Sequence, residues 1–530
     1  MKNYLGATLG LTLLVTLLLC GLSLIAPSAV MGFKLKQANI LADIVSDSAM
    51  RAAVGLPPIP EAGDDMLAMW VDDEYLESPV ATDSLFRADM LEWEGMGADD
   101  ADGVTDSTFA GPDTTVDTAG TAIGETMTGS VVTDPESGTR YVYSKSTAEP
   151  PAGLTPIKDY SPEGNSLRPF FEKLDEAAHL ERPVRIAVLG DSFIEGDIMT
   201  ADLREMFQKT YGGGGVGFVP ITSQVAAFRR SVAHKFGDWQ NWSIVNSSSR
   251  GDYTISATTF EPKEDAFVEW KGSKYKANLG SFATARLLFI NRDNTRIKAT
   301  VNEAKTLEFT PPASPELQEI VVSDSISSIR FEFSSVDGFT AYGAFLENSK
   351  GVSLDNYSVR GNSGIPLSRV NHELCTQLDN ISPYDLLVLE YGLNATMPDV
   401  TNYSGYMKQM TNSVEHLKKC FPEAAILVLS VSDRSTRVAG KFVTMQGIKA
   451  MEHTQHELAK KTGVAFWSTL DAMRQMGGME TFVENGWAAQ DYTHLGAKGG
   501  AKVAGALFES LMFEKLRWEK TPLPDTDSSF

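Results

Sequence analysis

The stretch Val184–Asp197, VRIAVLGDSFIEGD, decides the fold of this chain. Its first part is rich in Val, Ile and Leu, which indicates a buried strand, and the run ends at Gly190. Asp191 and Ser192 follow before a helical pattern begins. A strand that turns sharply into a helix places the next side chain at the carboxyl edge of a parallel sheet, where open α/β folds bind ligands. Ser192 is therefore either a nucleophile or the cap of the following helix.

Two later stretches favour the nucleophile. Asp385–Asn394, DLLVLEYGLN, is a second buried-strand pattern, and it brings Asn394 to the same edge, where the amide can donate to a developing oxyanion. Asp491 and His494 are three residues apart, so the carboxylate can orient the imidazole while the other ring nitrogen faces Ser192. An isolated Asp-x-x-His pair is more often structural, so the signal lies in the combination.

In this order the motifs resemble those of the SGNH (GDSL-type) hydrolase superfamily. The matching blocks are Gly190-Asp-Ser192, Gly361, Gly392-Leu-Asn394 and Asp491-Tyr-Thr-His494. The resemblance covers roughly residues 160–516 and is interrupted by one large insertion. It implies an α/β fold, a three-layer α/β/α sandwich with a parallel sheet. The implied catalytic triad is Ser192, His494 and Asp491, and the implied oxyanion donors are Ser192 N–H, Gly361 N–H and the Asn394 side chain.

The sequence is also similar to a narrower, periplasmic branch that includes peptidoglycan O-acetylesterases. The further matching segments are Tyr211–Phe218 with its four glycines, Val464–Trp467 and Met476–Gly478. At Phe193 the sequence departs from some members of this branch, which have His at the matching position. The resemblance implies removal of O-acetyl groups from an envelope glycan without a cofactor. No Cys-x-x-Cys or His-Glu-x-x-His metal sequence is present.

Three function classes remain open from the sequence. The first is a serine esterase that deacetylates peptidoglycan or another envelope glycan. The second is an O-acetyltransferase with the same triad, in which a sugar hydroxyl replaces water in the second step. The third is a non-catalytic glycan-binding protein, which would have no reason to keep Ser192, Asn394, Asp491 and His494 together.

The N-terminal segment 5–30 is apolar and uncharged, which is long enough to span a bilayer. An uncleaved anchor is favoured over a cleaved signal peptide, and residues 31–56 show the periodicity of a juxtamembrane helix. We therefore expect the protein on the periplasmic side of the inner membrane, or secreted to the periplasm if the segment is cleaved. A glycan at the acceptor sequence Asn394-Ala-Thr would block the expected site, which also favours a bacterial periplasm.

Residues 57–162 are predicted to form an acidic disordered linker. Its part from Glu61 to Thr139 contributes −19 of the net charge of −23, and its composition is low in hydrophobic residues. The remaining chain has no basic stripe, so nucleic acid is not an expected partner. The sequence leaves the oligomeric state open.

The catalytic domain is expected over residues 163–220 and 351–516, followed by a C-terminal tail, 517–530. Short strand patterns separated by turns over 221–350 predict an inserted β-sandwich, which the resemblance likens to a carbohydrate-binding module. Its tryptophans either stack on sugars or fill the core. Asp197 or Thr200 is expected to cap a helix. Cys375 and Cys420 are expected on one face of the sheet, as free thiols rather than as a disulfide.

Overall fold

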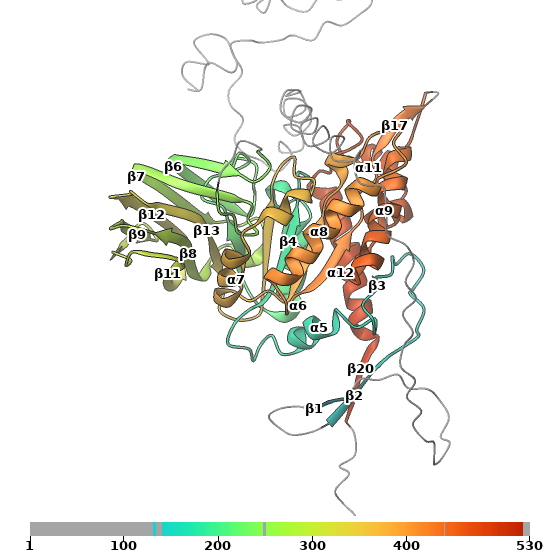
Figure 1. Cartoon of the computed structure of the whole chain (residues 1–530), viewed down its shortest axis with the longest axis horizontal. Helices are drawn as coiled ribbons and strands as arrows, with labels where there is room; N and C mark the ends of the chain where they lie inside the picture. The colour runs from blue at the N-terminus through green and yellow to red at the C-terminus, as the bar shows by residue number, and fades with distance from the viewer. Residues whose placement is uncertain (1–130, 134–139, 247–250, 439, 523–530) are drawn as a thin grey trace, which may run out of the picture. The chain divides into compact units, whose positions relative to one another are not determined.

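A computed structural model describes residues 131–133, 140–246, 251–438 and 440–522 (Figure 1). The expected anchor, the juxtamembrane helix, most of the acidic linker and residues 523–530 lie outside the described residues. Within the described ranges, no helix combines the length and the apolar character needed to cross a membrane.

A six-stranded sheet forms the centre of the α/β part. Its strands, in spatial order, are β14 (Val352–Ser358), β4 (Val184–Gly190), β15 (Leu386–Glu390), β16 (Ala425–Leu429), β19 (Ala465–Trp467) and β3 (Lys158–Asp159). Neighbouring strands are parallel except that β3 is antiparallel to β19. Every residue of β4, β15 and β16 is buried, as expected for parallel strands covered on both faces. The expected mixed α/β class is therefore confirmed.

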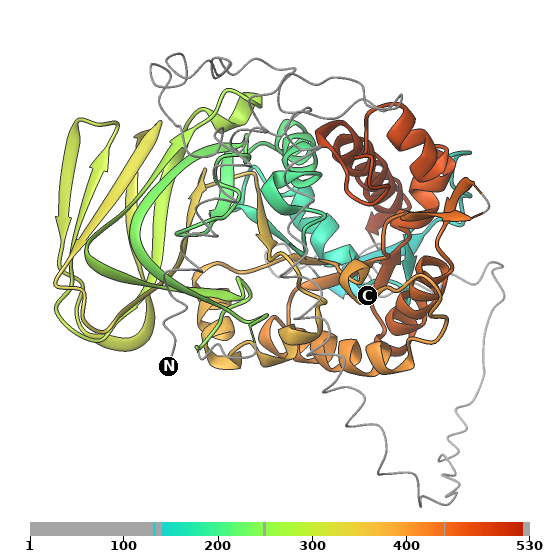
Figure 2. The same ribbon diagram turned by 90° about the horizontal axis from the view of Figure 1, so that it is seen from above.

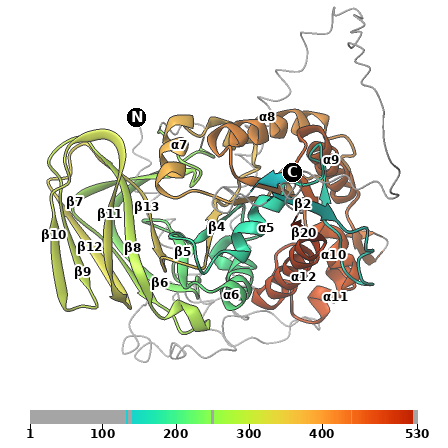
Figure 3. The same cartoon turned by 90° about the horizontal axis from the view of Figure 1, so that it is seen from below.

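Helices lie on both sides of this sheet. They are α5 (Arg168–Asp175), α6 (Thr200–Tyr211), α7 (His372–Ile381), α8 (Ser404–Cys420), α9 (Gln446–Thr462), α10 (Thr469–Gln475), α11 (Gly478–Glu484) and α12 (Ala497–Leu516). Figure 3 shows α7, α8 and α9 along one side of β4, with α6 and α12 on the other, and Figure 2 shows the same division. Cys375 and Cys420, on α7 and α8, are buried and free.

The region between α6 and β14 is antiparallel and has its own apolar core. Its strands are β5 (Gly215–Val219), β6 (Val232–Ser243), β7 (Thr258–Gly272), β8 (Phe282–Asn291), β9 (Arg296–Val301), β10 (Lys305–Phe309), β11 (Ser314–Ile326), β12 (Ser328–Ser334) and β13 (Phe339–Glu347). The sequence predicts two packed sheets, whereas the pairing joins all nine strands in one network. The long strand β7 explains the difference, because it pairs with β6, β12 and β13.

Trp270 fills the interior of this region rather than a sugar-binding face. Trp270 is fully buried, and it packs on His234 and Phe331. Trp239 is half-buried, packs edge-to-face on Phe333 and donates its N–H to the Phe267 carbonyl. Trp270 therefore cannot stack on a sugar without unpacking the core.

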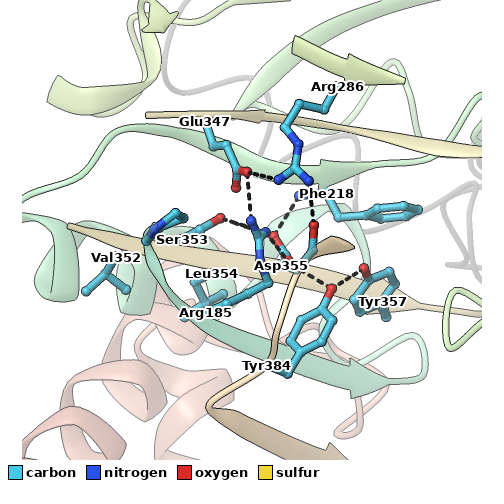
Figure 4. Close-up of polar contacts among 12 residues, drawn as sticks. Arg185, Phe218, Arg286, Glu347, Val352, Ser353, Leu354, Asp355, Tyr357 and Tyr384 are labelled. Carbon is cyan, nitrogen blue, oxygen red and sulfur yellow. Dashed lines mark hydrogen bonds and ion pairs between the residues drawn. The ribbon is translucent and has the colours of Figure 1, made fainter. Parts of the chain in front are cut away.

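Buried charges join this antiparallel region to the parallel sheet (Figure 4). Arg185 on β4 donates to Glu347 on β13 at 2.7 Å and to Asp355 on β14 at 3.0 Å. Arg286 on β8 also donates to Glu347, at 3.0 Å, and Tyr384 donates to Asp355. Burial alone would lower the pKa of Arg185, but Glu347 and Asp355 raise it well above its usual value, so the guanidinium stays charged.

The acidic linker ends earlier than the sequence predicts. β2 (Arg140–Lys145) pairs with β20 (Trp518–Pro522), β3 extends the main sheet, and Ile157 is buried. The Trp467 indole donates to the Thr155 carbonyl at 3.2 Å. Residues 140–160 therefore belong to the folded part, because this short stretch carries enough apolar surface to pack once the acidic composition ends.

Candidate active site

The turn after β4 carries Asp191 and Ser192. Gly190 has no room for a side chain, since an added Cβ would lie 2.8 Å from Ile194 and 2.9 Å from Glu390 Oε2. Asp191 is fully buried, and its Oδ1 accepts the N–H of Phe193 at 2.9 Å, which closes the turn. Ser192, between them, is half-buried. Its side chain thus reaches the carboxyl edge of the sheet without capping α6, which has no side-chain cap.

Asp197 anchors the other end of this turn. The sequence predicts Asp197 or Thr200 as the cap of α6, but no side chain caps this helix. Asp197 instead accepts hydrogen bonds from Arg229 at 3.0 Å and from Asn356 at 3.0 Å. Burial alone would raise the pKa of Asp197, but the guanidinium groups of Arg204 and Arg229 hold it well below its usual range. A charged carboxylate therefore fastens the turn to β14.

Asn394 reaches the same turn from β15. It lies in a short 3-10 turn, Leu393–Ala395, that follows Gly392, whose φ of 114° and crowded surroundings require glycine. The Asn394 side-chain nitrogen donates to Asp191 Oδ2 at 2.7 Å and to the Asn362 carbonyl at 3.2 Å. Sequence reasoning missed Asn362, although it follows the expected oxyanion residue directly.

Gly361 is exposed on the loop after β14. Its φ is 77°, and no atom lies within 4 Å of the position that a Cβ would occupy. Its neighbour Arg360 forms an ion pair with Glu195, which lies three residues after Ser192. This pair, which the sequence did not reveal, joins the Gly361 loop to the Ser192 turn.

Asp491 and His494 form a hydrogen-bonded pair in one loop. His494 Nδ1 lies 2.6 Å from Asp491 Oδ2, and Asp491 Oδ1 accepts the backbone N–H groups of Thr493 and His494 at 3.0 and 3.1 Å. Burial alone would raise the pKa of Asp491, but hydrogen bonding to His494 and its charge lower it below the usual value. An ionised Asp491 on Nδ1 leaves Nε2 as the free ring nitrogen.

The His494 loop is held in shape by a neighbouring hairpin. Tyr492 has a left-handed φ of 54°, and its ring stacks on Phe442 with the centroids 3.5 Å apart. Phe442 lies on β18 (Lys441–Thr444), which pairs with β17 (Ser435–Val438), and the N–H of Ser435 donates to the Tyr492 carbonyl at 3.1 Å. Two contacts therefore support a strained residue between Asp491 and His494.

The expected site residues fall into two groups. Asn394 contacts the Ser192 turn directly through Asp191, and His494 pairs with Asp491. In the described part of the chain no hydrogen bond joins Ser192 to His494. Burial raises the pKa of both Asp191 and Glu195, which lie on either side of Ser192, and the charge of His494 opposes that rise. Such contacts often tighten only when substrate binds.

The described residues offer no metal centre, because no three His, Cys, Asp or Glu side chains among them are arranged to hold an ion. The side chains described above offer a hydroxyl, an imidazole, two carboxyls and amide donors.

Comparison with known proteins supports the fold. No protein-family model matches the chain, and no curated protein is similar to it in sequence. The structure is similar to that of a peptidoglycan O-acetylesterase, at 20% identity and a TM-score of 0.57, over 68% of this chain and 99% of that chain.

Weaker similarities are found to two further solved structures. A family two carbohydrate esterase from Cellvibrio japonicus has 10% identity and a TM-score of 0.23, over 54% of this chain and 99% of that chain. A putative GDSL-like lipase from Parabacteroides merdae has 14% identity and a TM-score of 0.25, over 30% of this chain and 73% of that chain. The likeness to the peptidoglycan O-acetylesterase shows that this chain shares the fold of that protein, as the sequence resemblance predicts.

Proposed function

We propose that this protein is a serine esterase that removes O-acetyl groups from a cell-envelope glycan, peptidoglycan, with Ser192, His494 and Asp491 as its triad. One observation supports the proposal most: the Asn394 amide donates to Asp191 beside Ser192, and a hydrogen-bonded His494–Asp491 pair is present whose charge opposes the rise in the pKa of Asp191. A hydroxyl, a base and an amide donor at one edge are the parts that acyl transfer requires.

In the proposed reaction His494 Nε2 takes the proton of Ser192, whose oxygen attacks the acetyl carbonyl. The N–H groups of Ser192 and Gly361 and the Asn394 amide stabilise the oxyanion. In the resting structure both Asn394 side-chain hydrogens are engaged, so one must be released. The longer contact, 3.2 Å to the Asn362 carbonyl, is the one we expect the oxyanion to replace.

His494 then returns the proton to the sugar oxygen, and the alcohol leaves. A water molecule, deprotonated by His494, attacks the acetyl-enzyme, and acetate is released as Ser192 regains its proton. Asp491 holds the imidazole through Nδ1 during both steps.

The proposal also covers the domain architecture of the enzyme and its location in the cell. A three-layer α/β/α sandwich with an inserted β-domain would present the site, and segment 5–30 would hold it on the periplasmic side of the inner membrane. An acetylated glycan and that membrane are then its partners, with the acidic segment as a tether.

The test measures acetate released from O-acetylated peptidoglycan and from acetylxylan, side by side. We expect release from peptidoglycan, loss of release in Ser192→Ala, and no change in Ser404→Ala, which alters an exposed serine at the start of α8. Turnover in Ser192→Ala equal to that of the wild type would overturn the proposal. Acetate that appears only on an added sugar acceptor would identify a transferase instead.

A further inference from the structure

Glu390 is a buried carboxyl that the proposed mechanism does not use. It is the last residue of β15, and its register partner on β4 is Gly190. Its exposed fraction is 0%, and in the part of the chain that the structure describes neither carboxyl oxygen has a hydrogen-bond partner. Oε2 lies so close to Gly190 that an added Cβ there would be 2.9 Å away. The carboxyl therefore rests against the backbone, one residue before Asp191.

The groups that face Glu390 supply no positive charge to balance it. Burial raises the pKa of Glu390 well above its usual value, and the charge of Asp191 raises it further. The remaining titratable groups that act on this pair are Tyr391, Tyr406, Glu195 and His494. Burial also raises the pKa of both tyrosines, so they stay neutral.

The charge of His494 acts on Asp191, whereas no cation among the described residues acts on Glu390, so ionisation of both adjacent buried carboxyls is disfavoured and the pair keeps a proton. Burial raises the pKa of Asp191 to about 7, while the Phe193 N–H and the charge of His494 lower it from what burial alone would give. Asp191 accepts two hydrogen bonds, from Phe193 N–H and from Asn394, whereas Glu390 has beside it only the backbone N–H of Asp191, which does not reach hydrogen-bond geometry and lowers the pKa of Glu390 less than burial raises it. Asp191 is therefore the member that ionises, and Glu390 is the member that holds the proton.

We propose that Glu390 is a positioning residue that stays protonated and so leaves a single negative charge on Asp191, which holds the Asn394 amide beside Ser192. The positioning role rests on the proposed esterase function, because Asn394 is its oxyanion donor. The buried proton itself does not depend on that function.

The first experiment measures the folding equilibrium of full-length Glu390→Gln and wild type in mild detergent between pH 5 and pH 8. The unfolded chain releases the Glu390 proton above about pH 4.3, while the folded protein keeps it, so wild-type stability falls as pH rises. Glutamine carries no such proton. The variant should therefore gain at least tenfold in folding equilibrium constant over wild type between pH 5 and pH 7.

The matched control is Glu509→Gln, which changes an exposed glutamate on α12. It should show no such gain. If the stability of wild type and of Glu390→Gln changes in parallel with pH, Glu390 does not hold a buried proton. This measurement needs no catalytic activity.

The second experiment measures hydrolysis of an aryl acetate across pH. Glu390→Gln, a neutral polar isostere, should keep kcat within about threefold of wild type, whereas Glu390→Leu should lose at least tenfold in kcat with KM unchanged. In the Leu variant an apolar group faces Asp191, so the ionised form of Asp191 is less favoured. The acid limb of the pH profile of kcat should therefore move to higher pH.

A folded Glu390→Leu with wild-type kcat and pH profile would overturn the positioning role. Absence of hydrolysis by the wild type would instead overturn the proposed function, and the stability curves would still decide the buried proton.

Discussion

At the scale of single residues, the site depends on which atoms hold the Asn394 amide. Asn394→Ala removes one oxyanion donor and should lower kcat on an acetyl ester by about 10²–10³-fold, with KM little changed. Steady-state kinetics measure both constants. Asn294→Ala, on an exposed turn of the antiparallel region, is the control. A loss confined to KM would place Asn394 in substrate binding instead.

Asp491 should act through His494 rather than on the substrate. Asp491→Asn keeps the shape of the side chain but replaces the carboxylate on Nδ1 by a neutral amide that can favour the wrong imidazole tautomer, so we expect kcat to fall by about 10⁴-fold with residual turnover. Single-turnover acetate release measures this. A change of less than tenfold would mean that another group orients the imidazole.

At the scale of elements, the β17–β18 hairpin stabilises the His494 loop. Phe442→Ala removes the ring that stacks on Tyr492, so the left-handed residue between Asp491 and His494 loses a support. We expect kcat to fall by about tenfold or more, because small displacements of catalytic groups are costly. Val443→Ala, at an exposed position of the same hairpin, should leave kcat unchanged. Equal effects of the two changes would assign the loss to the hairpin as a whole.

At the scale of the whole molecule, Arg185 couples the antiparallel region to the parallel sheet. Arg185→Leu leaves Glu347 and Asp355 buried with one cation fewer, and should lower the free energy of unfolding by about 3–5 kcal/mol. Denaturant titration measures it. The control, Lys298→Met, removes an exposed partner of Glu332 and should cost less than about 1 kcal/mol. A comparable small loss in both variants would show that the buried network is not needed for stability.

The boundary of the folded part is testable by truncation. Removal of residues 1–139 keeps β2, β3 and the Thr155 contacts, so the product should be soluble and active. Removal of residues 1–160 deletes these elements together with Ile157, and so exposes the apolar surface against which Ile157 packs. This product should therefore melt several degrees lower and aggregate. If both products melt at the same temperature, residues 140–160 contribute nothing to the fold.

The sequence by itself determined the local features. Uninterrupted apolar runs predicted the strands β4, β15 and β16, because buried parallel strands leave that pattern, and the motifs that follow them predicted the candidate residues. The mixed α/β class and the fold shared with the peptidoglycan O-acetylesterase follow from the same patterns. The roles of Ser192, Asp491 and His494 stay predictions.

Only the tertiary structure decided which distant groups meet. In the sequence Glu390 is only the charged residue that ends an apolar run. It becomes a buried neighbour of Asp191 because parallel pairing sets β15 beside β4. Arg185, Glu347 and Asp355 likewise meet across three strands, and Phe442 reaches Tyr492 from a separate hairpin. Burial and charge compensation depend on neighbours that are far apart in the chain, so no local pattern encodes them.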